Sequence, residues 1–229
     1  MGMFPWNRPL YSAKLGSMKT RRGFALTVPI LLLALLLVLP AFAVLKPGAK
    51  LVPFSLKNVD GKDYAVAVED GRLTLTVTET VAGETKTVKT HPAAVLVDFW
   101  ATWCVPCRKA MPHMQKLSET YGPAADRTEG GLVVLGIALD EAGGKVVKPF
   151  YNKLKITYPM LADAPTAPAA AGVAATAKDM KKVYGVQEIP VVYVFNATGT
   201  VTHAHVGATD ELEAALDKAV AALVGGGVK

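Results

Sequence analysis

The two cysteines of this 229-residue chain stand close together, as Cys104-Val105-Pro106-Cys107. They follow the apolar run Val95–Phe99, which is typical of a buried strand, and residues 104–121 show the pattern of a helix. A disulfide that closes so short a loop stabilises a fold little, so the spacing favours reversible redox chemistry over a structural cross-link. The alternative is a zinc site, which needs two further ligands, and no such ligand is close in sequence.

The position of the pair predicts a different role for each cysteine. The first turn of a helix offers unpaired N–H groups and the positive end of the helix dipole. These stabilise a thiolate on Cys104 and lower its pKa, which makes Cys104 the attacking group. Cys107 lies one turn further into the helix, where we expect it to be shielded and to resolve the mixed disulfide.

Asp98 is the one charged residue in the apolar strand that leads to the cysteines. Burial of its carboxyl group would raise the pKa. Asp98 could then take the proton of Cys107, directly or through a water, as Cys107 attacks the mixed disulfide. The alternative is a structural aspartate that caps a turn at the end of the strand.

The rest of the chain predicts an α/β fold in which a mixed sheet has helices on both faces. Strand patterns occupy residues 132–139, 191–195 and 200–206, helical patterns residues 145–155 and 210–223, and a Thr/Val-rich region at 64–90 predicts an extra N-terminal β-hairpin. We expect one domain over residues 46–224, with an Ala/Pro-rich insertion at about 162–177 and a flexible tail at 225–229.

Residues 1–23 form a basic leader, and Phe24 to Leu45 contain no charged side chain. These 22 residues would span roughly 33 Å as a helix, enough to cross a bilayer. They are either an uncleaved transmembrane anchor or a signal segment cleaved after Ala41-Phe42-Ala43. Both alternatives export the domain. The seven Lys and Arg of residues 1–50 explain the net charge of +6, because the remaining 18 are balanced by 19 Asp and Glu; the domain therefore has no basic surface for nucleic acid.

The segment Val97-Asp98-Phe99-Trp100-Ala101-Thr102-Trp103-Cys104-Val105-Pro106-Cys107 resembles the active-site segment of thioredoxin. Pro112 matches the helix-kinking proline of that family, and Glu188-Ile189-Pro190 is similar to the loop that carries its cis-proline. With the exported leader and the strand end at Leu139-Asp140, the chain resembles the membrane-anchored TlpA/ResA type, whose members are disulfide reductases, several of them linked to cytochrome c maturation. Three positions depart from the pattern of these relatives, since Asp98 stands where Asn is common, Ala110 where Glu is found and Val191 where Thr is common.

The resemblance implies a thioredoxin-like fold and a substrate-binding surface. Pro190 would be cis and would hold the Ile189 backbone beside Cys104, where it could pair with a substrate strand and keep metal from the thiols. Trp103 would flank Cys104 as an apolar docking surface. No cofactor is implied beyond the Cys104–Cys107 disulfide, and His203 and His205 fit a surface better than a metal site. We expect His113, after the kink proline, to be solvated.

The leading hypothesis is an exported thiol–disulfide oxidoreductase, acting as a reductant on exported proteins with accessible cysteines and served by a membrane electron donor. It would work at the periplasmic or extracytoplasmic face of a bacterial cell envelope, with residues 24–45 in the lipid if uncleaved. Two alternatives stay open. One is copper delivery, or the reductive preparation of a copper site. The other is a peroxiredoxin-like peroxidase, although Thr102 is two residues before Cys104 rather than three.

Overall fold

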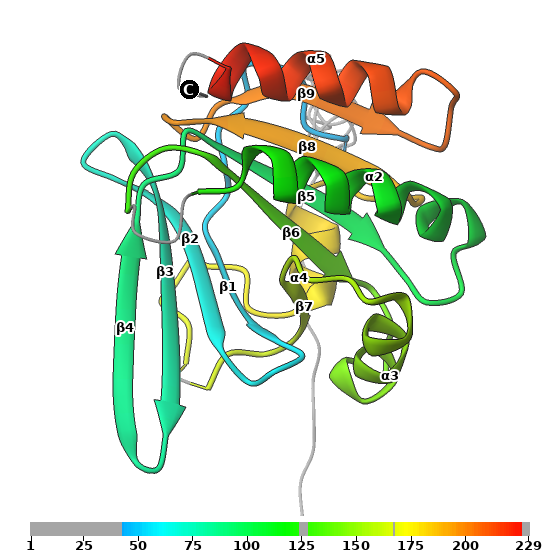
Figure 1. Cartoon of the computed structure of the whole chain (residues 1–229). Coiled ribbons are helices and arrows are strands. Elements are labelled where there is room, and N and C mark those ends of the chain that lie inside the picture. The colour runs from blue at the N-terminus through cyan, green and yellow to red at the C-terminus, as the bar shows by residue number, and fades with distance from the viewer. Residues whose placement is uncertain (1–42, 124–127, 167, 226–229) are drawn as a thin grey trace, which may run out of the picture. The chain divides into compact units, whose positions relative to one another are not determined.

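The fold is built on one nine-stranded sheet, seen in a computed structural model that describes residues 43–123, 128–166 and 168–225 (Figure 1). The strand order is β4-β3-β2-β1-β7-β6-β5-β8-β9. The strands are β1 (Phe54–Asn58), β2 (Asp63–Glu69), β3 (Arg72–Val81), β4 (Glu84–Thr90), β5 (Ala94–Trp100), β6 (Leu132–Ala138), β7 (Met160–Asp163), β8 (Val191–Asn196) and β9 (Val201–Val206). The helices are α2 (Val105–Tyr121), α3 (Gly144–Leu154), α4 (Ala177–Val183) and α5 (Leu212–Val224).

Strand β5 is the centre of the sheet and is buried along its whole length. It runs parallel to β6 and antiparallel to β8, so the sheet is mixed as predicted. Its side chains alternate between two cores, because successive residues of a strand point to opposite faces. Leu96 and Trp100 face the core beneath α2 and α5, whereas Val97 and Phe99 face the core beneath α4. Figure 1 shows α2 and α5 on the near face and α4 behind the sheet, which confirms helices on both faces.

The N-terminal extension is larger than the single hairpin expected at residues 64–90. It consists of β2, β3 and β4, joined by two hairpins and added to the sheet beyond β1. The two turns are Asp70-Gly71 and Ala82-Gly83, and all four residues have positive φ. Such two-residue turns match the twist of paired strands. The Asp-Gly and Ala-Gly pairs therefore form two consecutive hairpins in a region where the sequence pattern predicted one hairpin.

The Ala/Pro-rich segment at about 162–177 is partly structured. Its first residues end β7, which the sequence analysis did not separate from the insertion. Ala174 then lies against the start of β1, where its N–H donates to Pro53 O at 3.0 Å and its carbonyl accepts from Ser55 N at 2.9 Å. The segment leads into α4, whose first turn is capped by the Thr176 hydroxyl.

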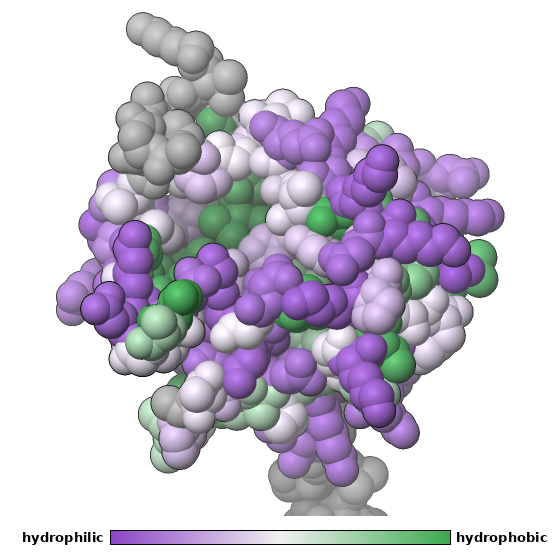
Figure 2. Space-filling model, turned by 60° about the horizontal axis from the view of Figure 1, so that its bottom comes forward, coloured by the Kyte–Doolittle hydropathy of each residue, from purple (hydrophilic) through white to green (hydrophobic). Residues whose placement is uncertain are grey.

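The leader at 1–23, most of the apolar segment at 24–45 and most of the tail at 225–229 lie outside the described residues. Among the residues that the structure does describe, no helix is long and apolar enough to cross a membrane. The face seen in Figure 2 is mostly hydrophilic, and its hydrophobic side chains gather mainly in a recessed area. The large apolar side chains are instead concentrated in the two cores.

Candidate active site

Cys104 and Cys107 form a disulfide at the start of α2, with 5.3 Å between their Cα atoms. Cys104 is the N-cap of the helix, and its Sγ accepts a hydrogen bond from the Cys107 N–H at 3.2 Å. No acidic residue lies in the first turn of α2. Cys104 thus lies beside a backbone N–H and the positive end of the dipole of a 17-residue helix. Both stabilise a thiolate at this position.

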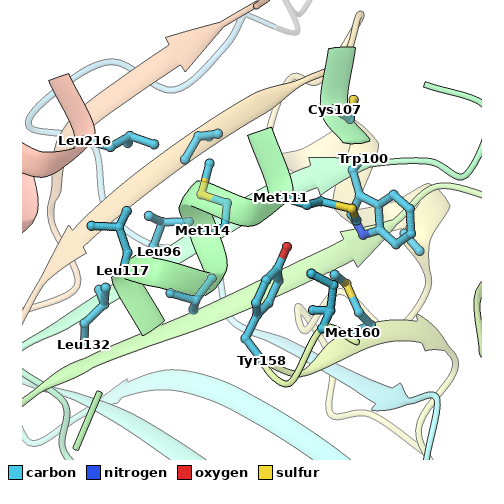
Figure 3. Close-up of a cluster of buried hydrophobic side chains, with 14 of the residues drawn as sticks. Leu96, Trp100, Cys107, Met111, Met114, Leu117, Leu132, Tyr158, Met160 and Leu216 are labelled. Atoms are coloured by element: carbon cyan, nitrogen blue, oxygen red, sulfur yellow. The ribbon is translucent and has the colours of Figure 1, made fainter. Parts of the chain in front are cut away.

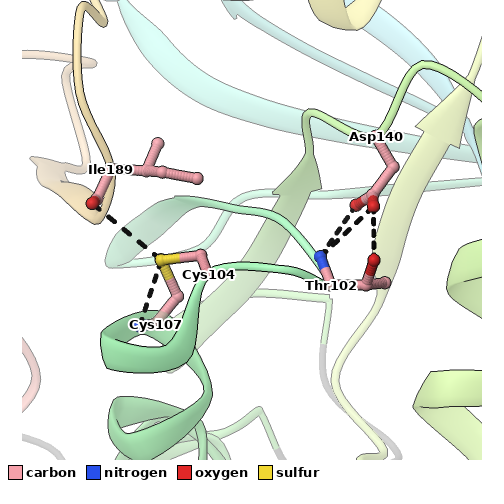
Figure 4. Close-up of a disulfide and its surroundings, with 5 residues drawn as sticks. All are labelled: Thr102, Cys104, Cys107, Asp140 and Ile189. Carbon is pink, nitrogen blue, oxygen red and sulfur yellow. Dashed lines mark hydrogen bonds between the residues drawn. A yellow bond between two sulfur atoms is a disulfide. The ribbon is translucent and has the colours of Figure 1, made fainter.

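A second loop lies against the disulfide. The Ile189–Pro190 peptide bond is cis, as the resemblance implied, and Cys104 Sγ is 3.9 Å from the Ile189 carbonyl oxygen (Figure 4). The Gly207 N–H donates to Pro190 O at 2.8 Å, which fixes this loop to the chain after β9. Pro190 is buried and Ile189 is partly buried, whereas Trp103 is 68% exposed beside Cys104. Strand ends and the helix start therefore bring Cys104 and Trp103 close to Ile189, although Cys104 and Ile189 are 85 positions apart in the sequence.

Asp98 lies on β5 and its side chain is 2% exposed. It has Leu96 and Trp100 two positions to either side, and these residues belong to the same core as Cys107. Alternation along the strand places Asp98 on that face, beneath α2. Burial raises the pKa of the Asp98 carboxyl group from its ordinary value of 3.8 to about 7. At neutral pH this group can both accept and return a proton. Its role in turnover stays a prediction.

Asp140 is a site residue whose function the sequence analysis did not assign. It follows β6, is 8% exposed, and accepts hydrogen bonds from Thr102 N at 3.0 Å and from the Thr102 hydroxyl at 2.5 Å (Figure 4). The Leu139 N–H also donates to Trp100 O at 2.8 Å. These bonds fix the loop between β5 and Cys104. The sequence feature that could have identified Asp140 is a carboxylate just after a buried parallel strand. The carboxyl ends of such strands meet at one edge of a sheet, where ligands commonly bind.

An open cleft of about 1360 Å³ lies beside Thr102 and Trp103, the residues that precede Cys104, and runs along the carboxyl ends of β6 and β7. Trp103 and Ile189 stand at its start, and it continues past the loop after β6 to the start of α4. Its walls carry acidic side chains from Glu141 and Glu188 and basic side chains from Lys178 and Lys181.

The prediction that His113 is solvated is wrong. Its side chain is 7% exposed, because the ring lies between α2 and α5. Nδ1 is 3.5 Å from the Glu213 carboxylate and Nε2 is 3.2 Å from the Asp217 carboxylate. Glu213 and Asp217 are one turn apart on α5, so both reach the same ring. The error arose because the sequence does not reveal which helix packs beside α2.

The two histidines of β9 lie side by side, with His203 and His205 rings stacked at 6.3 Å between centroids. Burial lowers the pKa of His203, and the charge of His205 adds to this effect. Within the described ranges, no group of three or more His, Cys, Asp or Glu side chains is placed to hold a metal ion.

Comparison with known proteins agrees with this geometry. The AhpC/TSA family model matches residues 47–204, which is more than half of the chain. The chain belongs to the AhpC/TSA family of thioredoxin-like proteins. It is 31% identical over 142 residues to the thioredoxin-like protein YneN of Bacillus subtilis, covering 61% of this chain and 73% of YneN. It is 24% identical over 166 residues to the thiol-disulfide oxidoreductase ResA of Halalkalibacterium halodurans, covering 72% of each protein.

Solved structures of the same fold are also known. A Chlorobium tepidum protein described as a thiol:disulfide interchange protein DsbE has a TM-score of 0.51 and 22% identity, over 79% of this chain and 99% of that chain. The resemblance to thioredoxin-like proteins of the TlpA/ResA type and the thioredoxin-like fold are therefore confirmed. The chain is an enzyme of the thiol–disulfide oxidoreductase class, and its Cys104–Cys107 disulfide is the redox group.

Proposed function

We propose that this protein is an exported reductant, which transfers electrons from a membrane donor to the disulfides of exported proteins. The observation that carries the proposal is the redox pair at the start of α2, opposite the cis-Pro190 loop and beside the exposed Trp103. The charge-free segment from Phe24 to Leu45 supports export and attachment to the inner membrane. The open cleft beside Trp103 and Ile189 supports protein disulfides as substrates, because it does not enclose a small molecule.

The catalytic cycle follows from these positions. The Cys104 thiolate attacks one sulfur of the substrate disulfide, forms a mixed disulfide and releases the other substrate sulfur as a thiolate. The proton of Cys107 passes to the Asp98 carboxylate, and Cys107 attacks Cys104 Sγ. This step forms the Cys104–Cys107 disulfide and releases the second substrate thiolate. Two electrons have then passed to the substrate, and a dithiol donor must reduce the enzyme again.

Several features support this direct dithiol exchange. Ile189 presents its backbone beside Cys104, where main-chain hydrogen bonds would accept substrates of varied sequence. Relatives named thiol-disulfide oxidoreductases support the same class of reaction. The resemblance to the TlpA/ResA type, several of whose members are linked to cytochrome c maturation, makes that pathway the one we propose. Peroxidase activity and copper delivery are less well supported, because both cysteines are joined in one disulfide and no third metal ligand lies near them among the described residues.

Reduction of insulin disulfides by the full-length protein tests the proposal. We expect turnover with a dithiol donor, and loss of turnover in Cys104→Ser because the chain contains no other attacking thiol. The reaction of Cys107→Ser should stop once each molecule has formed one mixed disulfide with the substrate. Unchanged turnover in Cys104→Ser would refute the assignment, and faster reaction with a peroxide than with insulin would favour the peroxidase alternative.

A further inference from the structure

The core beneath α2 contains polar groups that dithiol exchange has not yet explained. The Tyr158 side chain is 1% exposed and the Trp100 side chain is fully buried. Neither the Tyr158 hydroxyl nor the Trp100 indole nitrogen has a hydrogen-bond partner within the described part of the chain. A buried polar group without a partner is costly to keep in a folded protein, so two such groups in one core call for a physical explanation.

Gly136 relates these groups to Asp98. It lies directly opposite Asp98 in the register of β5 and β6, and its N–H donates to Pro159 O at 3.0 Å. A Cβ atom at Gly136 would be 3.1 Å from Trp100 Nε1. The same Cβ atom would collide with Met160 Sδ, so Met160 and Trp100 pack over this glycine beside Asp98. Pro159, which follows Tyr158, is bonded to the same glycine through its carbonyl.

Tyr158 is held on both sides. Its neighbour Thr157 is tied to α2, because the Thr157 N–H donates to Gln115 Oε1 at 2.9 Å and its hydroxyl accepts from Gln115 Nε2 at 2.6 Å. Its other neighbour, Pro159, is tied to β6 through Gly136. Figure 3 shows the resulting orientation, in which the Tyr158 hydroxyl points from the sheet side toward α2 and Met111, in the same core as Trp100 and Cys107.

The two unpartnered groups share one chemical property, since an indole N–H can only donate a hydrogen bond and a phenol donates readily. Neither donor has a hydrogen-bond acceptor in this core, as far as the described residues show. Ionisation of Asp98 would create one, because a carboxylate is a strong acceptor. The charge of Asp98 is close enough to raise the pKa of Tyr158 further than burial alone does.

We propose that Tyr158 is a positioning residue, whose hydroxyl donates a hydrogen bond to the ionised Asp98 carboxylate, directly or through one shared water molecule. The inference rests on the proposed function, because the carboxylate matters only if Asp98 accepts the proton of Cys107. In that step Tyr158 keeps its own proton. It stabilises the base that receives one, and the stabilisation is lost once Asp98 is protonated.

Few other titratable groups border this core in the described residues. Helix α2 contributes Cys107 and His113, and both nitrogens of His113 are directed to carboxylates of α5. Helix α3 contributes Tyr151, which lies near Tyr158. Strands β6 and β8 place Gly136 and Val192 opposite Asp98, so neither adds a charge. Among the titratable groups of this core in the described residues, Tyr158 is thus the buried hydroxyl donor without a partner.

The test is Tyr158→Phe in the full-length reduced protein. Stopped-flow reaction with a chromogenic aromatic disulfide separates attack by Cys104 from resolution by Cys107, since each releases one coloured thiolate. Resolution in wild type should accelerate as pH rises through the Asp98 pKa. Loss of a hydrogen bond to a charged group should move this midpoint upward by about one pH unit, which slows resolution by up to about tenfold at pH 6 while leaving attack unchanged. The side-chain carboxyl carbon of Asp98, followed by NMR, should show the same upward shift.

Tyr184→Phe is the matched control. Tyr184 is equally buried but lies in the core on the other face, where its hydroxyl donates to Val52 O at 2.6 Å. Its removal should leave the midpoint in place, and Asp98→Asn with Tyr158→Phe should behave as Asp98→Asn alone. An unmoved midpoint in Tyr158→Phe, with an altered profile in Asp98→Asn, overturns this inference and leaves the proposed function intact. An unaltered profile in Asp98→Asn overturns the assignment of Asp98 and the inference with it, whereas loss of insulin reduction in wild type overturns the proposed function itself.

Discussion

At the scale of single residues, burial gives Asp98 the acid strength that its chemistry needs. An exposed aspartate is ionised at neutral pH and is a poor base, because its conjugate acid loses the proton too readily. Desolvation on β5 raises the pKa of Asp98 to about 7. The same strand position that makes the group expensive to bury therefore makes it able to exchange a proton with Cys107.

This cost should be visible in stability, and Asp98→Asn measures it. The folded pKa of about 7 lies above the ordinary value of 3.8, so the folded state binds more protons between these pH values. Stability then falls as pH rises through this window, and the total loss is on the order of 4 kcal/mol. Urea unfolding of the oxidised protein should show roughly 3 kcal/mol of this loss between pH 5 and pH 8 in wild type, relative to the variant.

The quantity to compare is the difference in unfolding free energy between wild type and Asp98→Asn at each pH, since other groups also titrate in this range. Asp98→Asn keeps the shape of the side chain and removes its charge, so the variant should be the more stable protein at pH 8. Equal pH dependence in both proteins would show that Asp98 is not desolvated in the folded state, and would also remove the basis for its role as a base.

At the scale of elements, the connection between β5 and α2 decides where Cys104 lies. Asp140 holds this loop through the Thr102 N–H and hydroxyl. Thr102→Val removes the hydroxyl donor but keeps the β-branched shape, which leaves a nearly buried carboxylate oxygen with one fewer partner. We expect a loss of about 1–3 kcal/mol in the free energy of unfolding, together with slower attack by Cys104 on a small disulfide.

Thr80→Val is a suitable control, because the Thr80 hydroxyl pairs only with Thr85 on the exposed β3–β4 hairpin. That variant should change stability by less than about 0.5 kcal/mol. A similar small effect in Thr102→Val would mean that the loop is held by its backbone bonds alone, such as that from Leu139 N to Trp100 O.

The elements also show how far sequence reasoning reaches. Strand β5, the redox helix and the C-terminal helix follow from local patterns of apolar residues, and the turns Asp70-Gly71 and Ala82-Gly83 carry their own signal. The burial of His113 and the position of Tyr158 depend on which element packs against which. Those choices are made by contacts distant in sequence, so the pattern around each residue does not contain them.

At the scale of the whole molecule, the site is assembled from two parts of the domain that are far apart in sequence. The redox pair comes from the β5–α2 connection, whereas the loop opposite it precedes β8. The sequence predicted this meeting only through its resemblance to thioredoxin, since spacing alone does not bring Ile189 next to Cys104. The cleft beside Trp103 and Ile189 lies next to this meeting point, where a substrate would approach Cys104.

Cys107→Ala turns this arrangement into a trap for the natural substrate. The variant keeps Cys104 able to attack, but removes the thiol that would release the product, so a mixed disulfide should persist. In cells that express the full-length variant, non-reducing electrophoresis followed by mass spectrometry should identify exported proteins with accessible cysteines joined to Cys104. Cys104→Ala with Cys107 intact is the control and should trap far less, because Cys107 is only 1% exposed.

The identity of the trapped proteins distinguishes the possible pathways. Apocytochrome c among them would support a role in cytochrome c maturation, whereas a copper-site protein with paired cysteines would indicate preparation of that site. If Cys107→Ala traps no exported protein while wild type still reduces small disulfides, protein substrates are excluded.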